Sequence, residues 1–245
     1  MMTPGRLEVG LVGTAPELAI MGLALAGAGH FPWTITEPAP ADRERVVSLL
    51  RGVSIQSPAE VVAATQLIII GAGEGETVAE IVESLAESWR PGQIVLHTSA
   101  EFGIGVLEAA TRKGAIPLAI HPVLTFTGTS LDLHRMKDAY FAVTAPSVAL
   151  PIAQALVVEM GGEPFVIAED DRPAYADAIA TVAEFSRAIV DQSTFRLQEI
   201  GVEHPGAVLR ALAHSAVEEA LRASSDGAID PIGRWLDETT SDDED

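Results

Sequence analysis

Three polar side chains that could take part in catalysis follow predicted strands in the middle of the sequence. Ser99 and His121 each come just after a short apolar run, and Thr125 lies on the loop after the second run. A hydroxyl or an imidazole at such a place can donate a proton to a carbonyl or imine while a cofactor supplies hydride. The structural alternative is that His121, which precedes Pro122, only fixes the loop by hydrogen bonding. Both interpretations stay open.

The segment after the first predicted strand stands where a dinucleotide-binding fold carries its phosphate loop. That loop needs the pattern G-x-G-x-x-G, whose glycines make the turn, admit the diphosphate and let the helix pack on the strand. Here the segment reads Gly13-Thr14-Ala15-Pro16-Glu17-Leu18, so only the first glycine is present. If a dinucleotide binds, Gly13, Thr14 and Ala15 are its expected contacts. Glu37, about 20 residues past the loop, would then hold a ribose hydroxyl.

The same segment has the T-x-x-E form of a helix capping box. We expect the Thr14 hydroxyl to accept the backbone N–H of Glu17, and the Glu17 carboxylate to accept the backbone N–H of Thr14. Pro16 removes one further amide donor. A helix that satisfies its own amino end, with a carboxylate where an anion would sit, has little left to bind a diphosphate.

Acidic residues follow several other predicted strand ends. In a doubly wound sheet, ligands bind outside the carboxyl ends of the strands. The acidic residues in the segments after these ends are Glu37, Glu74, Glu76 and Glu101. The nearby cations before residue 90 are Arg43 and Arg45. A solvated loop is the simpler interpretation of Glu74 and Glu76. The sequence nevertheless predicts an acidic crevice, which is a poor host for a diphosphate.

The elements that must position these residues alternate between strands and helices. Short apolar runs predict strands at 7–12, 33–36, 52–55, 66–70, 94–97, 116–120, 140–144 and 164–167. Helical patterns lie at 18–28, 42–50, from 57 onward, 77–89, 106–113 and 151–160. Strands that are apolar on both faces and alternate with helices indicate a parallel sheet covered on both sides. The predicted fold class is therefore α/β, a Rossmann-type doubly wound, mostly parallel sheet.

A smaller all-helical domain is predicted to follow the sheet. Only helical periodicity remains after the last strand, with long helices at 173–200 and 205–224. We expect a dinucleotide-binding-type domain at 1–171, a helical domain at 172–236 and an acidic disordered tail at 237–245. Apolar residues recur at helical spacing on both long helices, at Val182, Phe185, Ile189, Val208 and Leu212. A stripe of this width is typical of a core or a dimer seam.

Composition narrows the classes of partner. The chain of 245 residues has a formal net charge of −20 and no cysteine. Such an acidic chain repels nucleic acid and anionic membranes, and the lack of cysteine fits the reducing cytoplasm. The apolar stretch 9–29 is long enough to suggest a membrane span, but Pro16 and Glu17 interrupt it, so we expect a strand, a turn and a helix. No spacing of the H-E-x-x-H kind indicates a metal site.

Four motifs stand in order along the chain and carry a resemblance. They are His97-Thr98-Ser99-Ala100, Pro117-Leu118-Ala119-Ile120-His121-Pro122, Thr125-Phe126-Thr127-Gly128-Thr129 and Glu159-Met160-Gly161-Gly162-Glu163-Pro164. Together they resemble a bacterial family of NAD(P)-dependent oxidoreductases with a Rossmann-like domain and a C-terminal domain of unknown function. That family is similar to pyrroline-5-carboxylate reductase and to the 6-phosphogluconate dehydrogenase group. The resemblance extends from Val9 to about Arg234.

The resemblance implies a cofactor, a substrate side and a dimer. It implies NAD(P) held near the carboxyl ends of the strands, with the expected contacts Gly13, Thr14, Ala15, Glu37, Gly71, Ala72 and Thr98. It implies that Ser99, His121 and Thr125 line the substrate side. Related enzymes dimerise through the C-terminal helices, so a homodimer is expected.

The sequence also departs from the family pattern. The first loop lacks the family's glycines, and Ala72-Gly73-Glu74 stands where the family resembles V-P-D. Ala100 replaces a glycine. On the two long helices, Thr181 and Glu184 stand where the family has His and Asn, and Glu218-Glu219 replaces an Asp-Asn pair. The cofactor loop and the catalytic helix have therefore both diverged.

Two functions of different class remain open. In the first, the chain is a divergent homologue with weakened or lost dinucleotide binding that binds a small molecule or a protein partner. In the second, it is an active NAD(P)-dependent reductase or dehydrogenase that acts on a small carbonyl or imine. The physical reading of the first loop favours the first function, and the resemblance favours the second.

Overall fold

The computed structural model describes residues 6–225. The chain divides into two compact units, Met1–Ile179 and Ala180–Asp245, and each is described here by itself. The long helix α8 (Arg172–Glu199) begins in the first unit and continues into the second. A domain boundary near residue 171 remains our proposal, and the acidic tail predicted at 237–245 lies outside the described residues.

The first unit is built on one eight-stranded sheet in the order β3-β2-β1-β4-β5-β6-β7-β8. The strands are β1 (Glu8–Gly13), β2 (Phe31–Ile35), β3 (Ser54–Ile55), β4 (Leu67–Gly71), β5 (Ile94–His97), β6 (Ile116–Pro122), β7 (Tyr140–Thr144) and β8 (Glu163–Val166). Every neighbouring pair is parallel except β6 and β7, which are antiparallel. The predicted α/β fold with a mostly parallel sheet is confirmed.

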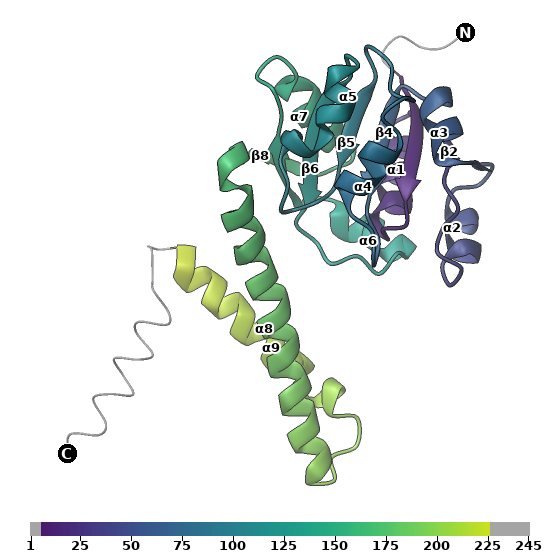
Figure 1. Ribbon diagram of the computed structural model, residues 1–245. Coiled ribbons are helices and arrows are strands. Elements are labelled where there is room, and N and C mark those ends of the chain that lie inside the picture. The colour runs from purple at the N-terminus through teal and green to yellow at the C-terminus, as the bar shows by residue number, and fades with distance from the viewer. Residues whose placement is uncertain (1–5, 226–245) are drawn as a thin grey trace. The chain divides into compact units, whose positions relative to one another are not determined.

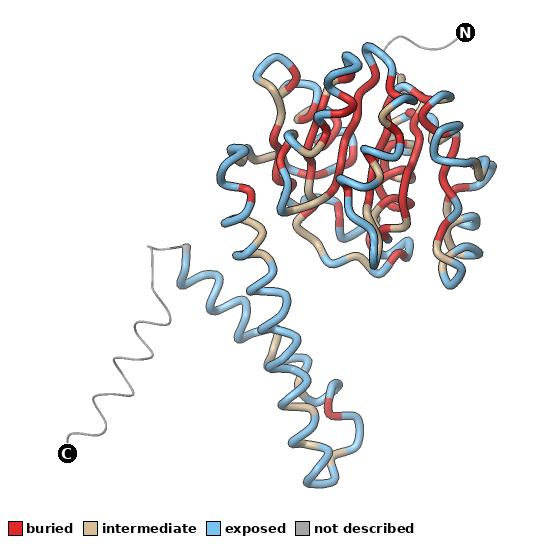
Figure 2. Tube along the Cα trace, viewed as in Figure 1, coloured by how far each residue is buried: buried red, intermediate tan, exposed pale blue. Residues whose placement is uncertain are grey.

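Helices cover both faces of this sheet (Figure 1). On one face lie α1 (Glu17–Gly27), α2 (Arg43–Leu49), α6 (Ser130–Met136) and α7 (Leu150–Glu159). On the other lie α3 (Pro58–Ala64), α4 (Val78–Ser84) and α5 (Glu108–Arg112), the last preceded by a 3-10 turn at Ile104–Leu107. The central strands are therefore buried on both sides, as the red segments of Figure 2 show. In β4 the side chains of Leu67 and Ile69 enter one core, and those of Ile68 and Ile70 enter the other.

The apolar stretch 9–29 forms β1, a turn and α1, as expected from its sequence. Strand β1 is almost wholly buried, and seven of the eleven residues of α1 are buried, because both elements pack in the core of the first unit. Among residues 6–225, no helix is both long enough and apolar enough to cross a bilayer.

One predicted helix was too long, and one helix was not predicted. The helix predicted at 77–89 ends at Ser84, because the chain turns there and the Trp89 indole N–H donates back to the carbonyl of Val82. Helix α6 was not predicted, since its seven residues give too short a pattern; Thr129 and Asp132 form a capping box at its amino end. By contrast, the helix predicted from residue 57 onward is confirmed: Ser57 is the N-cap of α3, and Pro58 lies in its first turn.

In the second unit, the rest of α8 and helix α9 (Pro205–Ser225) match the predicted long helices. Their apolar side chains are largely exposed, including Val182, Phe185, Ile189, Val208 and Leu212. Phe185, for example, keeps 64% of its surface exposed. Within the described residues, these side chains therefore form an apolar surface rather than a core.

Candidate functional site

The turn between β1 and α1 is held tightly against the end of β4. Gly13 has a positive φ of 109°, and a Cβ at this residue would collide with the carbonyl oxygen of Gly71. That same carbonyl accepts the backbone N–H of Ala15 at 3.2 Å. Only glycine fits such a conformation at such a contact. The first glycine of the loop therefore has a structural role whatever ligand binds here.

The capping box predicted for Thr14 and Glu17 is wrong. Helix α1 begins at Glu17, its N-cap is Pro16, and no side chain caps it. The Thr14 hydroxyl instead donates to the Glu76 carboxylate at 3.1 Å. The Glu17 carboxylate accepts the hydroxyl of Thr98 at 2.7 Å. The pattern misled because Glu17, in the first helical turn, lies beside the end of β5 and finds a partner there.

A carboxylate nevertheless lies at the amino end of α1. Burial raises the pKa of Glu17, while hydrogen bonds from the Thr98 hydroxyl and from its own backbone N–H oppose this rise. Two backbone amides of this turn are also used within the protein: Ala15 donates to Gly71, and Gly13 donates to the Thr36 hydroxyl at 3.0 Å. Pro16 has no amide hydrogen to offer.

A cavity of about 590 Å³ lies beside this turn and over the end of β2. Its lining includes Gly13, Thr14, Glu37, Glu60 and Glu76. In the structure Glu37 is held by Arg43, whose Nε donates to it at 2.7 Å, and both side chains are exposed. Three carboxylates and no lysine or arginine line this cavity, in keeping with the acidic crevice predicted from the sequence.

Two smaller cavities continue along the carboxyl ends of the strands, and both are lined by Glu17 and Thr98. One, of about 260 Å³, also includes Ala72, Ser99 and Glu101. The other, of about 210 Å³, is the one that His121 reaches. Thr98 is 5% exposed, and its backbone N–H donates to the carbonyl of Ile70 at 3.1 Å. The two predicted site residues Ser99 and His121 thus line different cavities.

His121 forms one side of the 210 Å³ cavity. Its Nδ1 lies 2.7 Å from the hydroxyl of Tyr175, a residue in the first turns of α8. Burial lowers the pKa of His121 to about 4, and the positive charge of Arg172 acts in the same direction. The imidazole is therefore neutral near pH 7. Leu124 and Phe126 add an apolar wall to the cavity.

Arg172 joins the first turn of α8 to three segments of the sheet. It is 0% exposed, and its guanidinium donates to the Thr144 hydroxyl at 2.8 Å and to the carbonyls of Ala119, Ala142 and Ser99. It also lies 5.9 Å from the centroid of the Tyr175 ring. This buried charge therefore lies next to Tyr175, the hydrogen-bond partner of His121.

The side chain of His97 has a structural role, since both of its ring nitrogens bond to the backbone. It is fully buried, its Nδ1 accepts the backbone N–H of Ser99 at 3.2 Å, and its Nε2 lies 2.8 Å from the carbonyl of Gly103. Burial lowers the pKa of His97 to about 4. Because Nδ1 is the acceptor, the proton must be on Nε2 and point at Gly103. His97 thus shapes the turn after β5 that carries Thr98 and Ser99.

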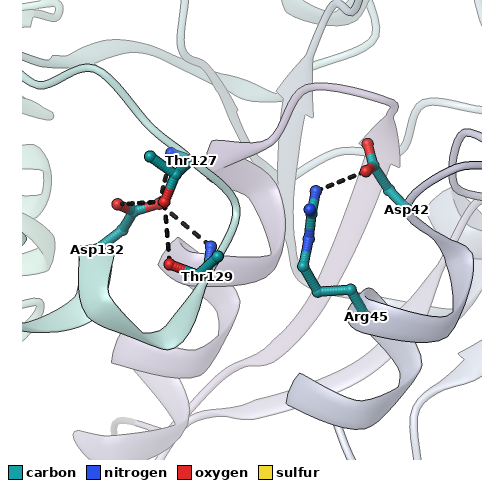
Figure 3. A network of polar contacts seen from close by, with 5 residues as sticks. All are labelled: Asp42, Arg45, Thr127, Thr129 and Asp132. Atoms are coloured by element: carbon teal, nitrogen blue, oxygen red, sulfur yellow. Dashed lines mark hydrogen bonds and ion pairs between the residues drawn. The ribbon is translucent and has the colours of Figure 1, made fainter. Parts of the chain in front are cut away.

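Thr125 is exposed on the loop after β6, and its neighbours Leu124 and Phe126 line the 210 Å³ cavity in its place. The end of this loop is fixed by Asp132, which is 0% exposed (Figure 3). Its carboxylate accepts the backbone N–H and the hydroxyl of Thr127 and the backbone N–H of Thr129. In Figure 3 Arg45 points toward Asp42, its ion-pair partner at 2.6 Å.

Sequence reasoning missed Arg172 and Tyr175. Both follow the last strand, where the sequence shows only the start of a long helix, and neither matches a motif. Their one signal is that an arginine and a tyrosine stand three residues apart, on the same side of a helix. Among the described residues, no group of three His, Asp or Glu side chains is placed to hold a metal ion.

Comparison with known proteins identifies two parts of the chain. Residues 1–122 match a Rossmann-like domain, and residues 139–240 match a domain of unknown function, DUF2520. No curated protein matches the sequence.

Solved structures with a similar fold have low sequence identity. A protein of Bacteroides fragilis assigned as an NADP oxidoreductase is 15% identical over 97% of this chain and 89% of its own, with a TM-score of 0.72. A 1-pyrroline-5-carboxylate reductase of Streptococcus pyogenes is 14% identical over 95% and 84%, with a TM-score of 0.65. An imine reductase of a Pseudomonas species is 15% identical over 91% and 77%, also at 0.65. These likenesses show a shared fold.

Proposed function

We propose that this chain, which belongs to the family joining a Rossmann-like domain to DUF2520, is a small-molecule-binding homologue with weakened or lost dinucleotide binding. The observation that carries the proposal is the Glu17 carboxylate at the amino end of α1, held there by Thr98 at 2.7 Å. A dinucleotide fold places the diphosphate against this helix end, where free amides and the helix dipole favour an anion.

The residues at this helix end do not fit a diphosphate. Glu17 brings a carboxylate, Pro16 brings no N–H, and the Ala15 N–H is bonded to Gly71. Beside them, the 590 Å³ cavity is lined by the carboxylates of Glu37, Glu60 and Glu76 and by no lysine or arginine. Two anions brought together without a cation repel each other. We therefore derive no hydride-transfer step for this chain.

The test of this proposal is thermal unfolding of the wild-type protein and of two alanine variants, each with and without a dinucleotide. We expect about 1 mM NADH or NADPH to leave the Tm of the wild-type protein unchanged, because a ligand stabilises only in proportion to its binding. Glu17→Ala removes the carboxylate and should allow a measurable rise in Tm. Glu83→Ala, the control, removes an exposed carboxylate from α4 and should behave as the wild type. A rise in Tm for the wild type, or none for Glu17→Ala, contradicts the proposed cause.

A second candidate function is an active NAD(P)-dependent reductase of a small carbonyl or imine. The observation in its favour is that His121 lines a cavity that reaches the start of α1 through Glu17 and Thr98. In that case Gly13, Thr14, Ala15, Glu37, Gly71, Ala72 and Thr98 would contact the cofactor, and Ser99, His121 and Thr125 would act on the substrate. The same titration decides, since this function requires the wild-type protein to bind NADH or NADPH.

We also propose that the apolar side chains of α8 and α9 form the seam of a homodimer. An exposed apolar stripe of this extent marks an interaction surface in many proteins. The charge of −20 argues against nucleic acid as the partner, and the absence of cysteine supports a cytoplasmic location.

A further inference from the structure

The 210 Å³ cavity brings together two titratable groups that lie far apart in the sequence of the first unit. Glu17 comes from the first turn of α1, and His121 comes from the end of β6. The remaining lining is mostly apolar or small, with Pro16, Ala100, Pro122, Leu124 and Phe126. Since one water occupies about 30 Å³ of liquid, the cavity suits a compound of a few carbon atoms.

The hydrogen bonds around the cavity fix what each group can do. Burial raises the pKa of Tyr175 to about 12, so its phenol keeps its proton. If that proton is donated to Nδ1 of His121, 2.7 Å away, the imidazole carries its own hydrogen on Nε2. Burial and, after it, the charge of Arg172 lower the pKa of His121 to about 4, so the imidazole is neutral near pH 7. His121 is then a hydrogen-bond donor that does not lose its role near neutral pH.

Glu17 has the opposite character. Its pKa is raised by burial, so its carboxylate is a stronger base than an exposed one. The Thr98 hydroxyl, at 2.7 Å, holds one carboxylate oxygen in place. The pKa of Glu17 is thus raised and that of His121 is lowered, and shifted pKa values of neighbouring groups in a cleft are typical of functional sites. The groups that face this pair are Thr98, Tyr175, Arg172 and His97.

We propose that this cavity catalyses cofactor-free proton transfer on a small carbonyl compound, with Glu17 as base and His121 as hydrogen-bond donor to the carbonyl oxygen. Glu17 removes a proton from the carbon next to the carbonyl. The C–H electron pair forms a carbon–carbon double bond, and the carbonyl π electrons move to the oxygen, which His121 Nε2–H stabilises. Glu17 then returns a proton to carbon. The outcome is exchange of the carbon-bound proton, with no oxidant or reductant.

This inference rests on the proposed function, because a diphosphate seated at the start of α1 would compete with the substrate for the space at Glu17. Tyr175 is a positioning residue in it: it acts through the tautomer of His121. The inference extends the proposed function by naming the chemical class of the ligand, a small compound with a hydrogen on the carbon beside a carbonyl.

The test is deuterium exchange followed by proton NMR in D₂O. The probes are hydroxyacetone, which is neutral, and pyruvate, which is anionic, without any nicotinamide. The wild-type protein should accelerate loss of the carbon-bound proton signal of at least one probe. Glu17→Gln keeps the size of the side chain but cannot take a proton, and should lower the enzymatic exchange rate by about 100-fold or more. Glu83→Gln, the same change on the exposed face of α4, should leave it unaltered.

Two further variants make the outcome specific. His121→Phe should also lower the exchange rate although Glu17 is intact, because it removes the donor to the carbonyl oxygen. Tyr175→Phe should lower the rate and shift the ¹⁵N signature of His121 from the Nε2–H toward the Nδ1–H tautomer. No exchange by the wild type with either probe, or equal exchange by Glu17→Gln, overturns the inference. The proposed function fails separately, if the wild-type protein binds NADH or NADPH.

Discussion

Burial of Glu17 favours the protonated form of its carboxyl group. Ionising this carboxyl in the folded protein should therefore lower the stability of the protein as pH rises. Because its pKa is raised from 4.5 in the folded protein, the folded chain binds more protons than the unfolded chain between the two pKa values. The free energy of unfolding must then fall as pH rises through that interval.

The prediction is a comparison of the wild-type protein with Glu17→Gln by thermal unfolding between about pH 4.5 and 8. The Tm of the wild type should decline relative to that of Glu17→Gln as pH rises, because glutamine does not ionise. The matched change Glu83→Gln, at an exposed position, controls for loss of one acidic group. A difference in Tm that stays constant with pH would show that Glu17 is not buried as described.

The imidazole of His121 should stay neutral at pH values well below the ordinary histidine pKa, because burial and Arg172 lower its pKa to about 4. We expect ¹⁵N NMR of His121 to show a neutral imidazole at pH 7 and through most of the acid range, with protonation only near pH 4. Below the unfolded pKa of 6.5, the unfolded chain binds the proton first, so this group contributes stability that is lost as pH falls. A midpoint near 6.5 would contradict the buried setting.

For single residues, the sequence predicted the place in the fold better than the hydrogen-bond partner. The apolar runs predict that Gly13, Ser99 and His121 lie at or just after the ends of strands, and they do. The capping box failed because the pattern T-x-x-E reports only local bonding, whereas Glu17 bonds to Thr98, 81 residues away along the chain. The Tyr175 partner of His121 lies 54 residues from it, and no local pattern encodes such a contact.

The turn between β1 and α1 is the element on which the site depends, and two glycines test it. Gly13 and Gly52 both have positive φ, of 109° and 84°, but only at Gly13 would a Cβ meet backbone, since nothing lies within 4 Å at Gly52. Gly52→Ala should cost about 1 kcal/mol of unfolding free energy through backbone strain. Gly13→Ala should cost roughly 3 kcal/mol or more, because the clash with Gly71 adds to that strain.

Urea unfolding of both glycine variants measures the difference directly. Equal losses at the two positions would mean that the turn is not pressed against β4. The Cβ contact at Gly13 is with main-chain atoms, so the neighbouring side chains cannot relieve it.

Elements were predicted well where the pattern was long or fully apolar. The strand β4 and the helices α8 and α9 follow from composition and periodicity alone, since burial on both faces or continuous helical spacing leaves a clear signal. The seven-residue α6 and the early end of α4 did not follow, because a short helix is decided by its caps and by distant contacts such as Trp89 with Val82. The antiparallel pairing of β7 with β6 was likewise not evident.

For the molecule as a whole, the exposed apolar side chains of the second unit predict self-association. With a chain mass of 25.7 kDa, a dimer would have twice that mass in solution. Sedimentation or light scattering should give the dimer for the wild-type protein, and Phe185→Asp together with Leu212→Asp should shift it to the monomer. Val148→Asp, a change of an 87% exposed side chain in the first unit, serves as control. A wild-type monomer would rule out the proposed seam.

The most direct test of the account is calorimetric titration of the wild-type protein with NADH and with NADPH. We predict no saturable heat up to about 1 mM of either, because the carboxylate at the start of α1 opposes the diphosphate. A dissociation constant in the micromolar range, on the order of −8 kcal/mol, would contradict the account.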